Sequence, residues 1–287
     1  MLTKASKCPT KLLQEVSDII VAHKDFLKYN LTSCNSQTEV ANALAASDSW
    51  FILGNGPSPA VLKLQILGRS ATVSEICTNA DSIPALASGL RAEVGALRLS
   101  KLTVRVPPEE VQPWVDSGFR RAFTYAQFSR APVVSNMMPL LPLSNPTEKD
   151  LLPLSQLMYA AYAKTDESLP DARSAETSLR ETMAGAGGAY LADASFASGT
   201  APNLVSACLI ATQEPGQAEI VRLFTHPLYR ARGLATTEIA AAMNRLSASG
   251  VKSISAWNRQ GNEVVRRLLA KMGFEKRKAV VELSASV

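Results

Sequence analysis

From Glu219 to Glu238 the sequence reads EIVRLFTHPLYRARGLATTE, and this stretch decides the fold. It begins as a strand that ends near Phe224, continues as a turn that contains two arginines and Gly233, and then becomes a helix. A strand that leads through such a turn into a helix aims unpaired main-chain N–H groups and the positive end of the helix dipole at one point. The stretch therefore predicts a site for a pyrophosphate group.

The same turn has a simpler interpretation, in which Gly233 only opens the helix while Arg230 and Arg232 are solvated. Small residues at positions 233 and 235 favour the phosphate site, because larger side chains would block a phosphate from the main chain. The turn alone does not choose between the two interpretations, so the neighbouring elements matter.

Helices and strands alternate around this stretch. We expect a hairpin turn at Glu214–Gln217, which requires antiparallel strands, and crossover helices, which require parallel ones. The sheet of this half is therefore mixed, and the fold class is α/β (α+β). The expected helices cover 148–163, 175–183, 234–247 and 263–272, and the expected strands cover 189–193, 204–212, 219–224, 251–257 and 278–283.

Two motifs in this half match a known family. The loop from Arg230 to Ala235 reads RARGLA and resembles the (Q/R)xxGx(G/A) signature of the GNAT superfamily of N-acetyltransferases. Downstream, Asn262 is followed by an expected helix and then by Gly273-Phe274, which is similar to the segment before the last strand in that superfamily. The element order extends the resemblance back to about Met137. It implies a mostly antiparallel sheet with flanking helices and a splayed central strand pair.

The resemblance also implies a site for acetyl-CoA, or another acyl-CoA, used as a co-substrate without a metal. The pantetheine arm is expected to pair with the main chain at Leu223, Phe224 and Thr225 and to bond with Asn262. Arg266 or Lys271 is expected near the adenosine phosphate, although a cation near a helix C-terminus is favourable by itself. The pyrophosphate is expected on the residues Arg230, Ala231, Arg232, Gly233, Leu234, Ala235 and Thr236.

Glu219 is the candidate general base, because an attacking amine must lose a proton. It lies on the strand that leads to the phosphate loop, as the glutamate base does in histone-type members that the segment resembles. Partial burial would raise the pKa of such a carboxyl and suit it to work near neutrality. The alternative is an exposed glutamate at the strand end. Main-chain N–H groups near Phe224 or Thr225 are expected to stabilise the oxyanion.

The position at which the superfamily often carries a tyrosine general acid is Leu269 here. Leu269 fits the buried stripe of its helix, so we expect it in the core. Water or another tyrosine (Tyr159, Tyr162 or Tyr190) could protonate the departing thiolate instead, and a thiolate is also a tolerable leaving group without assistance.

The first half of the chain contains a fainter version of the same pattern. A strand over 102–106, a short helix over 109–115, Gly118-Phe119 and an alternating strand from Arg120 parallel the last elements of the second half. The arginine-glycine loop has no counterpart before them. We therefore expect a tandem arrangement, with a degenerate GNAT-like domain over 1–132 and an acyl-CoA-binding catalytic domain over 133–287. An unrelated α+β first domain is the alternative.

Composition limits the other classes of function. The net charge is +5, but the 30 basic residues are offset by 25 acidic ones and form no long basic block. This argues against a nucleic-acid partner. Four separated cysteines and two histidines do not suggest a zinc site. There is no apolar signal core and no apolar run long enough to cross a bilayer, so we expect a cytoplasmic protein without a membrane partner.

Three functions follow from the sequence. The leading one is transfer of an acetyl or short acyl group from acyl-CoA to a primary amine, most simply that of a small molecule, with a protein amine as a variant. An acidic loop with Asp166, Glu167 and Asp171 could attract such a cation. The alternatives are a catalytically silent acyl-CoA-binding module and a nucleic-acid-binding protein. Oligomeric state and acceptor identity stay open.

Overall fold

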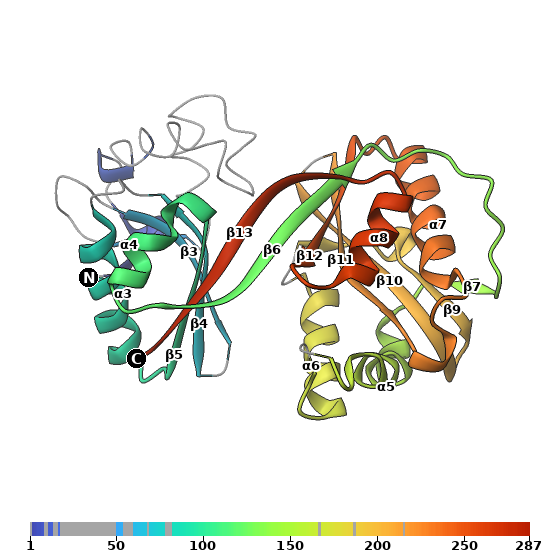
Figure 1. Cartoon of the computed structure of the whole chain (residues 1–287), viewed down its shortest axis with the longest axis horizontal. Helices are drawn as coiled ribbons and strands as arrows, with labels where there is room; N and C mark the ends of the chain where they lie inside the picture. Colours follow the sequence, from blue (N-terminus) through green and yellow to red (C-terminus); the bar gives the residue numbers. More distant parts are fainter. Residues whose placement is uncertain are drawn as a thin grey trace. The chain divides into compact units, whose positions relative to one another are not determined.

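The computed structural model describes residues 2–8, 11–13, 17, 50–53, 60–67, 69–77, 82–165, 168–185, 188–214 and 216–287. The chain divides into two compact units, which are coloured along the sequence in Figure 1. Unit 1 is Met1–Ala126 with Lys278–Val287, and unit 2 is Gln127–Arg277. The chain therefore passes between the units twice, within strands β6 (Arg120–Arg130) and β13 (Glu275–Ser286).

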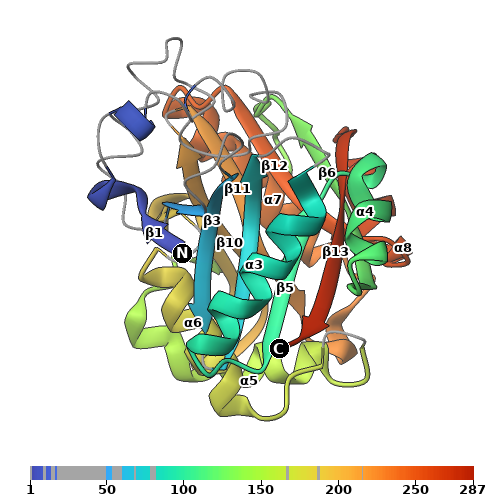
Figure 2. The same ribbon diagram turned by 90° about the vertical axis from the view of Figure 1, so that its left-hand side faces the viewer.

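Unit 1 contains strands in the order β1-β2-β3-β4-β5-β13. Only β4 and β5 are parallel neighbours among these, and helix α3 makes the crossover that such a pair requires. Figure 2 shows α3 lying across the strands of this sheet. The elements are β1 (Leu2–Lys4), η1 (Ala5–Lys7), β2 (Trp50–Leu53), β3 (Ala60–Leu67), β4 (Ser70–Cys77), α3 (Ile83–Ala96), β5 (Lys101–Val106), η3 (Pro108–Glu110) and α4 (Val111–Asp116).

The core of unit 1 lies between this sheet and its helices. Trp114 of α4 and Phe119 are almost fully buried and meet edge to face, with ring centroids 5.1 Å apart. The end of β13 completes the sheet, because Val281 to Ser286 pair antiparallel with β5. Leu283 of that segment is fully buried in the same core.

Unit 2 contains strands in the order β12-β11-β10-β9-β7, and β8 also pairs with β10. All these pairs are antiparallel except β11 with β12, which α7 connects. The elements are β7 (Leu143–Ser144), η4 (Glu148–Asp150), α5 (Leu151–Tyr162), α6 (Ala172–Met183), β8 (Ala189–Tyr190), η5 (Ala192–Ala194), β9 (Phe196–Thr200), β10 (Asn203–Glu214), β11 (Gln217–Thr225), η6 (Pro227–Tyr229), α7 (Leu234–Ala248), β12 (Ser253–Arg259) and α8 (Glu263–Lys271).

Helices cover both faces of the sheet in unit 2. Along β10, Ala207 and Leu209 belong to the apolar core that α5 and α6 form. Ser206, directly before Ala207, points to the other face, where its hydroxyl reaches Glu238 of α7. Side chains of a strand alternate between faces, so α5 and α6 lie on one side of the sheet and α7 on the other.

Most of the predicted elements are confirmed, and the repeated order is too. The order β4-α3-β5-α4-β6 recurs as β11-α7-β12-α8-β13. The prediction omitted β9, a short strand of mainly small residues. Its Gly199 has a φ of 106°, and a Cβ there would lie 2.6 Å from the Asn203 carbonyl oxygen, so only glycine fits this tight return. The predicted strand over 189–193 is shorter, since β8 has two residues.

The predicted division at residue 132 differs from the compact units in one important respect. The last ten residues, Lys278–Val287, belong to unit 1 and not to unit 2. The physical reason is that they pair with β5 and bury apolar side chains in the core of unit 1.

The composition also led to predictions about cysteines, metal sites and membrane-crossing segments. Cys8 and Cys208 are free thiols, and Cys208 is buried, whereas Cys34 and His23 lie outside the described residues. Among the described residues, no cluster of histidine, cysteine and acidic side chains is suited to hold a metal ion. No helix in the described ranges has the length and apolar character needed to cross a membrane.

Shortening a core side chain in the end of β13 tests its contribution to unit 1. Leu283→Ala should destabilise unit 1 by about 2–5 kcal/mol, because it leaves a cavity in the core. The exposed Ser286→Ala in the same strand is the matched control. Thermal unfolding followed by circular dichroism measures both variants. Equal melting curves for Leu283→Ala and Ser286→Ala would show that this segment does not complete the core.

Candidate functional site

The site begins where two neighbouring strands of unit 2 separate. Strands β11 and β12 pair in parallel only from Gln217 with Ser253 to Ile220 with Ala256. Directly afterwards β11 contains a bulge, because Leu209 and Ile210 of β10 pair with Arg222 and Ile220 and leave Val221 without a partner. Beyond the bulge, Leu223 to Thr225 continue to pair with β10. The other main-chain edge of Leu223 to Thr225 is therefore not paired with β12. This separation of β11 from β12 is the predicted splay.

The loop after β11 presents main-chain donors. His226 begins the short helix η6, and its Nδ1 accepts from the Leu228 N–H at 3.3 Å. Ala231 and Gly233 then adopt left-handed φ angles of 58° and 82°. A succession of such residues turns N–H groups toward a common point and makes an anion-binding concavity. The strain of a left-handed alanine is typical of a loop with a function.

The first turn of α7 adds three more donors to this loop. The first bond within the helix runs from the Thr237 N–H to the Gly233 carbonyl. The N–H groups of Leu234, Ala235 and Thr236 thus have no partner inside the helix. Together with the helix dipole they favour a negatively charged group at this point.

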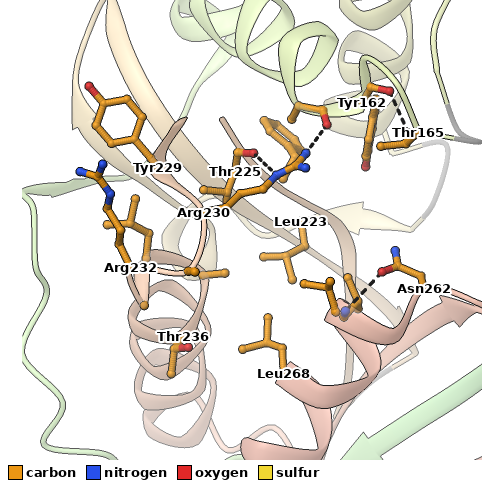
Figure 3. A pocket seen from close by; sticks show the side chains of 18 of the residues that line it. Tyr162, Thr165, Leu223, Thr225, Tyr229, Arg230, Arg232, Thr236, Asn262 and Leu268 are labelled. Atoms are coloured by element: carbon orange, nitrogen blue, oxygen red, sulfur yellow. Dashed lines mark hydrogen bonds between the residues drawn. The ribbon is translucent and has the colours of Figure 1, made fainter. Parts of the chain in front are cut away.

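The strand edge, the loop and α8 enclose a cavity of about 600 Å³. Figure 3 shows the labelled side chains, which come from α5, β11, the loop, α7 and α8, around this cavity. Eleven of the twelve predicted cofactor-binding residues line it: Leu223, Phe224, Thr225, Arg230, Ala231, Arg232, Gly233, Leu234, Ala235, Thr236 and Asn262. The further lining residues were not predicted to bind the cofactor: Ala161, Tyr162, Thr165, Tyr229, Arg259, Gln260, Gly261, Val264, Val265 and Leu268.

The lining of the cavity is cationic and apolar. Arg230, Arg232 and Arg259 contribute to it, and no carboxylate does among the described residues. Apolar side chains such as Leu223 and Leu268 form the rest of the wall. A cavity with cationic and apolar walls suits a ligand that combines phosphates with an uncharged chain.

Arg230 holds the mouth of the cavity in a defined shape. Its Nη2 donates to the Ala161 carbonyl at 2.5 Å, and its Nε donates to the Thr225 carbonyl at 3.4 Å (Figure 3). The guanidinium therefore joins the end of α5 to the end of β11. The Arg232 guanidinium instead lies over an aromatic ring, 5.2 Å from the ring centre of Tyr229.

The two residues predicted on α8 have different positions. Asn262 lines the cavity and is the N-cap of α8, where its Oδ1 accepts from the Val265 N–H at 3.3 Å. Arg266 is not among the described lining residues, and its Nη2 pairs with Glu263 Oε2 at 2.6 Å. Its predicted contact with an adenosine phosphate stays a prediction.

Glu219 lies on the same strand as the cavity, before the bulge. It is half-buried and pairs with Ala211 of β10 and Ser255 of β12. Directly opposite residues of an antiparallel pair point to one face, and Ala211 shares its face with Leu209. Glu219 therefore faces the side that α5 and α6 cover. It is not among the described cavity-lining residues, so its role as a base stays a prediction.

The candidate proton donors for the thiolate differ in their position relative to the cavity. Leu269 is fully buried, which confirms its expected place in the core. Of the three tyrosines that the sequence offered as substitutes, Tyr162 lines the cavity. The Tyr190 hydroxyl donates to the Pro146 carbonyl at 2.8 Å, and Tyr159 is exposed. Tyr229, which the sequence did not suggest, also lines the cavity.

The acidic loop offered as an amine-attracting region is described only in part. Asp166 and Glu167 lie outside the described residues. Asp171 is the N-cap of α6, and its Oδ1 accepts from the Ser174 N–H at 2.7 Å. Hydrogen bonding with Ser174, first with its side chain and then with its main chain, lowers the pKa of the Asp171 carboxyl.

Glu238 is the residue that the sequence analysis missed. It lies on α7 with its side chain fully buried, and it accepts hydrogen bonds from Ser198 at 2.6 Å and from Ser206 at 2.9 Å. Burial raises the pKa of this carboxyl to about 8, although the two serine hydroxyls lower it in part. Ser206 also lies 2.8 Å from the hydroxyl of Thr225, a cavity residue. The sequence signal for Glu238 was a charged residue at a position on the buried face of α7.

The titration of Glu238 should make stability depend on pH. Its folded-state pKa of about 8 exceeds the ordinary 4.5, so the folded protein binds more protons between these values. Stability should therefore fall as pH rises from 5 to 8, by at most roughly 5 kcal/mol from this group. Glu238→Gln should show a smaller fall in melting temperature, and the exposed Glu275→Gln should behave as wild type. Parallel curves for all three proteins would contradict a titration in this range.

Comparison with known proteins agrees with this geometry. Residues 156–274 match the sequence model of the Acetyltransferase (GNAT) family, and this range includes every described residue that lines the cavity. No curated protein matches the chain significantly.

Several solved structures share the fold. A GCN5-related N-acetyltransferase from Sphaerobacter thermophilus superposes with a TM-score of 0.69 at 11% identity, covering 100% of this chain and 95% of that one. A tandem GNAT protein from the clavulanic acid biosynthesis pathway gives 0.64 at 13% identity, with 100% and 98% covered. A GCN5-related N-acetyltransferase from Kribbella flavida gives 0.55 at 12% identity, with 95% of each chain covered. These likenesses confirm a fold of two tandem GNAT-like domains.

Proposed function

We propose that unit 2 transfers an acetyl or other short acyl group from acyl-CoA to a primary amine, most simply that of a small molecule. The observation that carries this proposal is the joining of an open strand edge, Leu223 to Thr225, to a loop of unpaired N–H groups within one cavity. The match of residues 156–274 to the GNAT family supports the same chemistry.

The residues of the cavity fit the parts of acyl-CoA. The N–H groups from Ala231 to Thr236 form the cradle for the pyrophosphate, and Gly233 leaves room for close approach. The free edge of β11 offers N–H and carbonyl groups to the amides of the pantetheine arm, much as another strand would. Asn262 borders this path from α8.

The chemistry requires a base and an oxyanion donor. We assign to main-chain N–H groups near Phe224 the stabilisation of the negative charge that develops on the carbonyl oxygen. Glu219 is the candidate base, because it is half-buried on the face of the sheet that α5 and α6 cover. The cysteamine sulfur leaves as a thiolate, for which Leu269 offers no proton.

A silent acyl-CoA-binding module is the second candidate function. The match to the GNAT family does not favour it. It is kept as the alternative because Leu269 is buried and Glu219 lies outside the described lining of the cavity. Both candidate functions require the same phosphate cradle, so they differ only in turnover.

Gly233→Asp tests the cradle. A carboxylate at this position would repel the pyrophosphate, so the affinity for acetyl-CoA should fall by about 100-fold or more in titration calorimetry. Gly250→Asp is the matched control, because Gly250 also has a positive φ of 73°, with open space around it and no part in the cavity. Aspartate tolerates such angles, so both variants should fold. Equal affinities for the two variants would refute the assignment.

A panel of amines tests the transfer itself. Free thiol release from acetyl-CoA should depend on the amine, and Glu219→Gln should lower kcat by about 100-fold or more while leaving acetyl-CoA affinity unchanged. The exposed Glu275→Gln should retain full activity. Tight binding of acetyl-CoA without thiol release for any amine would favour the silent module.

A further inference from the structure

A chain of hydroxyl groups connects the acyl-CoA cavity to a buried carboxyl. Thr225 lines the cavity at the end of β11, and its Oγ1 lies 2.8 Å from Ser206 Oγ. Ser206 in turn lies 2.9 Å from Glu238 Oε2, while Ser198 lies 2.6 Å from the other oxygen of that carboxyl. Apart from Thr225, which is half-buried, all these side chains are buried.

We propose that Glu238 is a positioning residue for acyl-CoA, which determines through Ser206 whether the Thr225 hydroxyl offers the cavity a hydrogen-bond donor or an acceptor. This inference rests on the proposed acyl-CoA site but not on turnover. It predicts that acyl-CoA binding is coupled to the uptake of a proton by Glu238.

The argument follows from the number of protons in the chain. Each hydroxyl has one proton to donate and two positions at which to accept. When Glu238 is ionised, its oxygens accept from Ser198 and Ser206. Ser206 then has no proton left for Thr225, so the short contact between them requires Thr225 to donate, and Thr225 can only accept from the cavity.

Protonation of the carboxyl reverses the chain. The new proton on Oε2 is donated to Ser206, which can then donate to Thr225 at 2.8 Å, a shorter contact than its 3.4 Å to the Phe224 carbonyl. Thr225 thereby keeps its own proton for a ligand. Acyl-CoA presents many acceptors, namely amide carbonyl and phosphate oxygens, so it should prefer this state. Removing the buried negative charge behind the cavity also favours a polyanionic ligand.

The surroundings of Glu238 contain few other charges. Strand β10 contributes the Cys208 thiol, whose pKa burial holds well above its usual range. The short helix η5 contributes Asp193, which pairs with Arg245 of α7 at 3.1 Å. Strands β9 and β11 contribute the neutral hydroxyls Ser198 and Thr225. Glu238, with a pKa of about 8, is therefore the group of this layer that should titrate between pH 7 and 9.

The affinity of the full-length protein for acetyl-CoA, measured against pH, tests the proposal. Acetyl-CoA is used because its thiol is blocked and cannot titrate. The dissociation constant of the wild type should be about tenfold larger at pH 9 than at pH 7, as expected when only the protonated form binds well. At pH 8, calorimetry in two buffers of different ionisation enthalpy should detect uptake of about half a proton per ligand.

Glu238→Gln provides a result that a purely structural role would not produce. Its amide is always neutral and can donate to Ser206 while accepting from Ser198, so it imitates the protonated acid. This variant should bind acetyl-CoA at pH 9 as tightly as wild type does at pH 7, without proton uptake. Thr225→Val, which removes the hydroxyl, should bind about tenfold more weakly at pH 7 and lose most of the pH dependence.

Ser198→Ala is the matched control, because Ser198 contacts Glu238 without belonging to the chain that leads to Thr225. Loss of its hydrogen bond to the ionised form should raise the pKa of Glu238 and move the pH midpoint upward, with unchanged affinity at pH 7. Cys208→Ala should retain the wild-type profile.

The outcomes separate the possible failures. A wild-type affinity that does not change with pH, or a Glu238→Gln profile equal to that of wild type, would overturn the proposal while the acyl-CoA site stands. Acetyl-CoA binding at no pH would overturn the site and this inference together. Binding with the predicted pH dependence but without thiol release would support the inference and refute only the proposed transfer.

Discussion

Main-chain hydrogen bonding between β11 and β12 stops after Ile220 and Ala256, and the cavity depends on that break. A strand edge that is paired throughout has no N–H or carbonyl groups to offer a ligand, whereas the separated edge at Leu223 to Thr225 has them. The bulge at Val221 bends β11 at the same place. The loop and the first turn of α7 follow directly, so the break and the bulge together set where the main-chain donor groups of the site begin.

The sequence predicted the parts of this site that follow from local chemistry. Gly233 and the helix after it specified the N–H donors, and eleven of the proposed cofactor residues line one cavity. Arg266 was harder to place, because local pairing with Glu263 three residues away competes with a distant phosphate. Glu219 was predicted on the correct strand. The face of the sheet to which its side chain points depends on a bulge and a pairing register that no local pattern encodes.

Other features escaped prediction because long-range packing decides them. Glu238 follows two threonines near the start of a helix, where a charged side chain is normally solvated, and only the packing of α7 on β9 and β10 buries it. Strand β9 consists mainly of small residues with little strand propensity, and its neighbours β7 and β10 hold it in the sheet. The return of β13 to β5 joins residues far apart in the sequence. Each case shows tertiary context overriding local preference.

The participation of β13 in both units has a consequence for the order in which the protein folds. The strand that completes unit 1 is synthesised only after the whole of unit 2. Until then β5 has an unpaired edge, and apolar groups of the unit 1 core stay uncovered, which is a condition that promotes aggregation. Folding of unit 2 during synthesis would bring the start of β13 into place first. The N-terminal unit would then be the last to complete its structure, and its completion would require that the whole C-terminal unit has been synthesised.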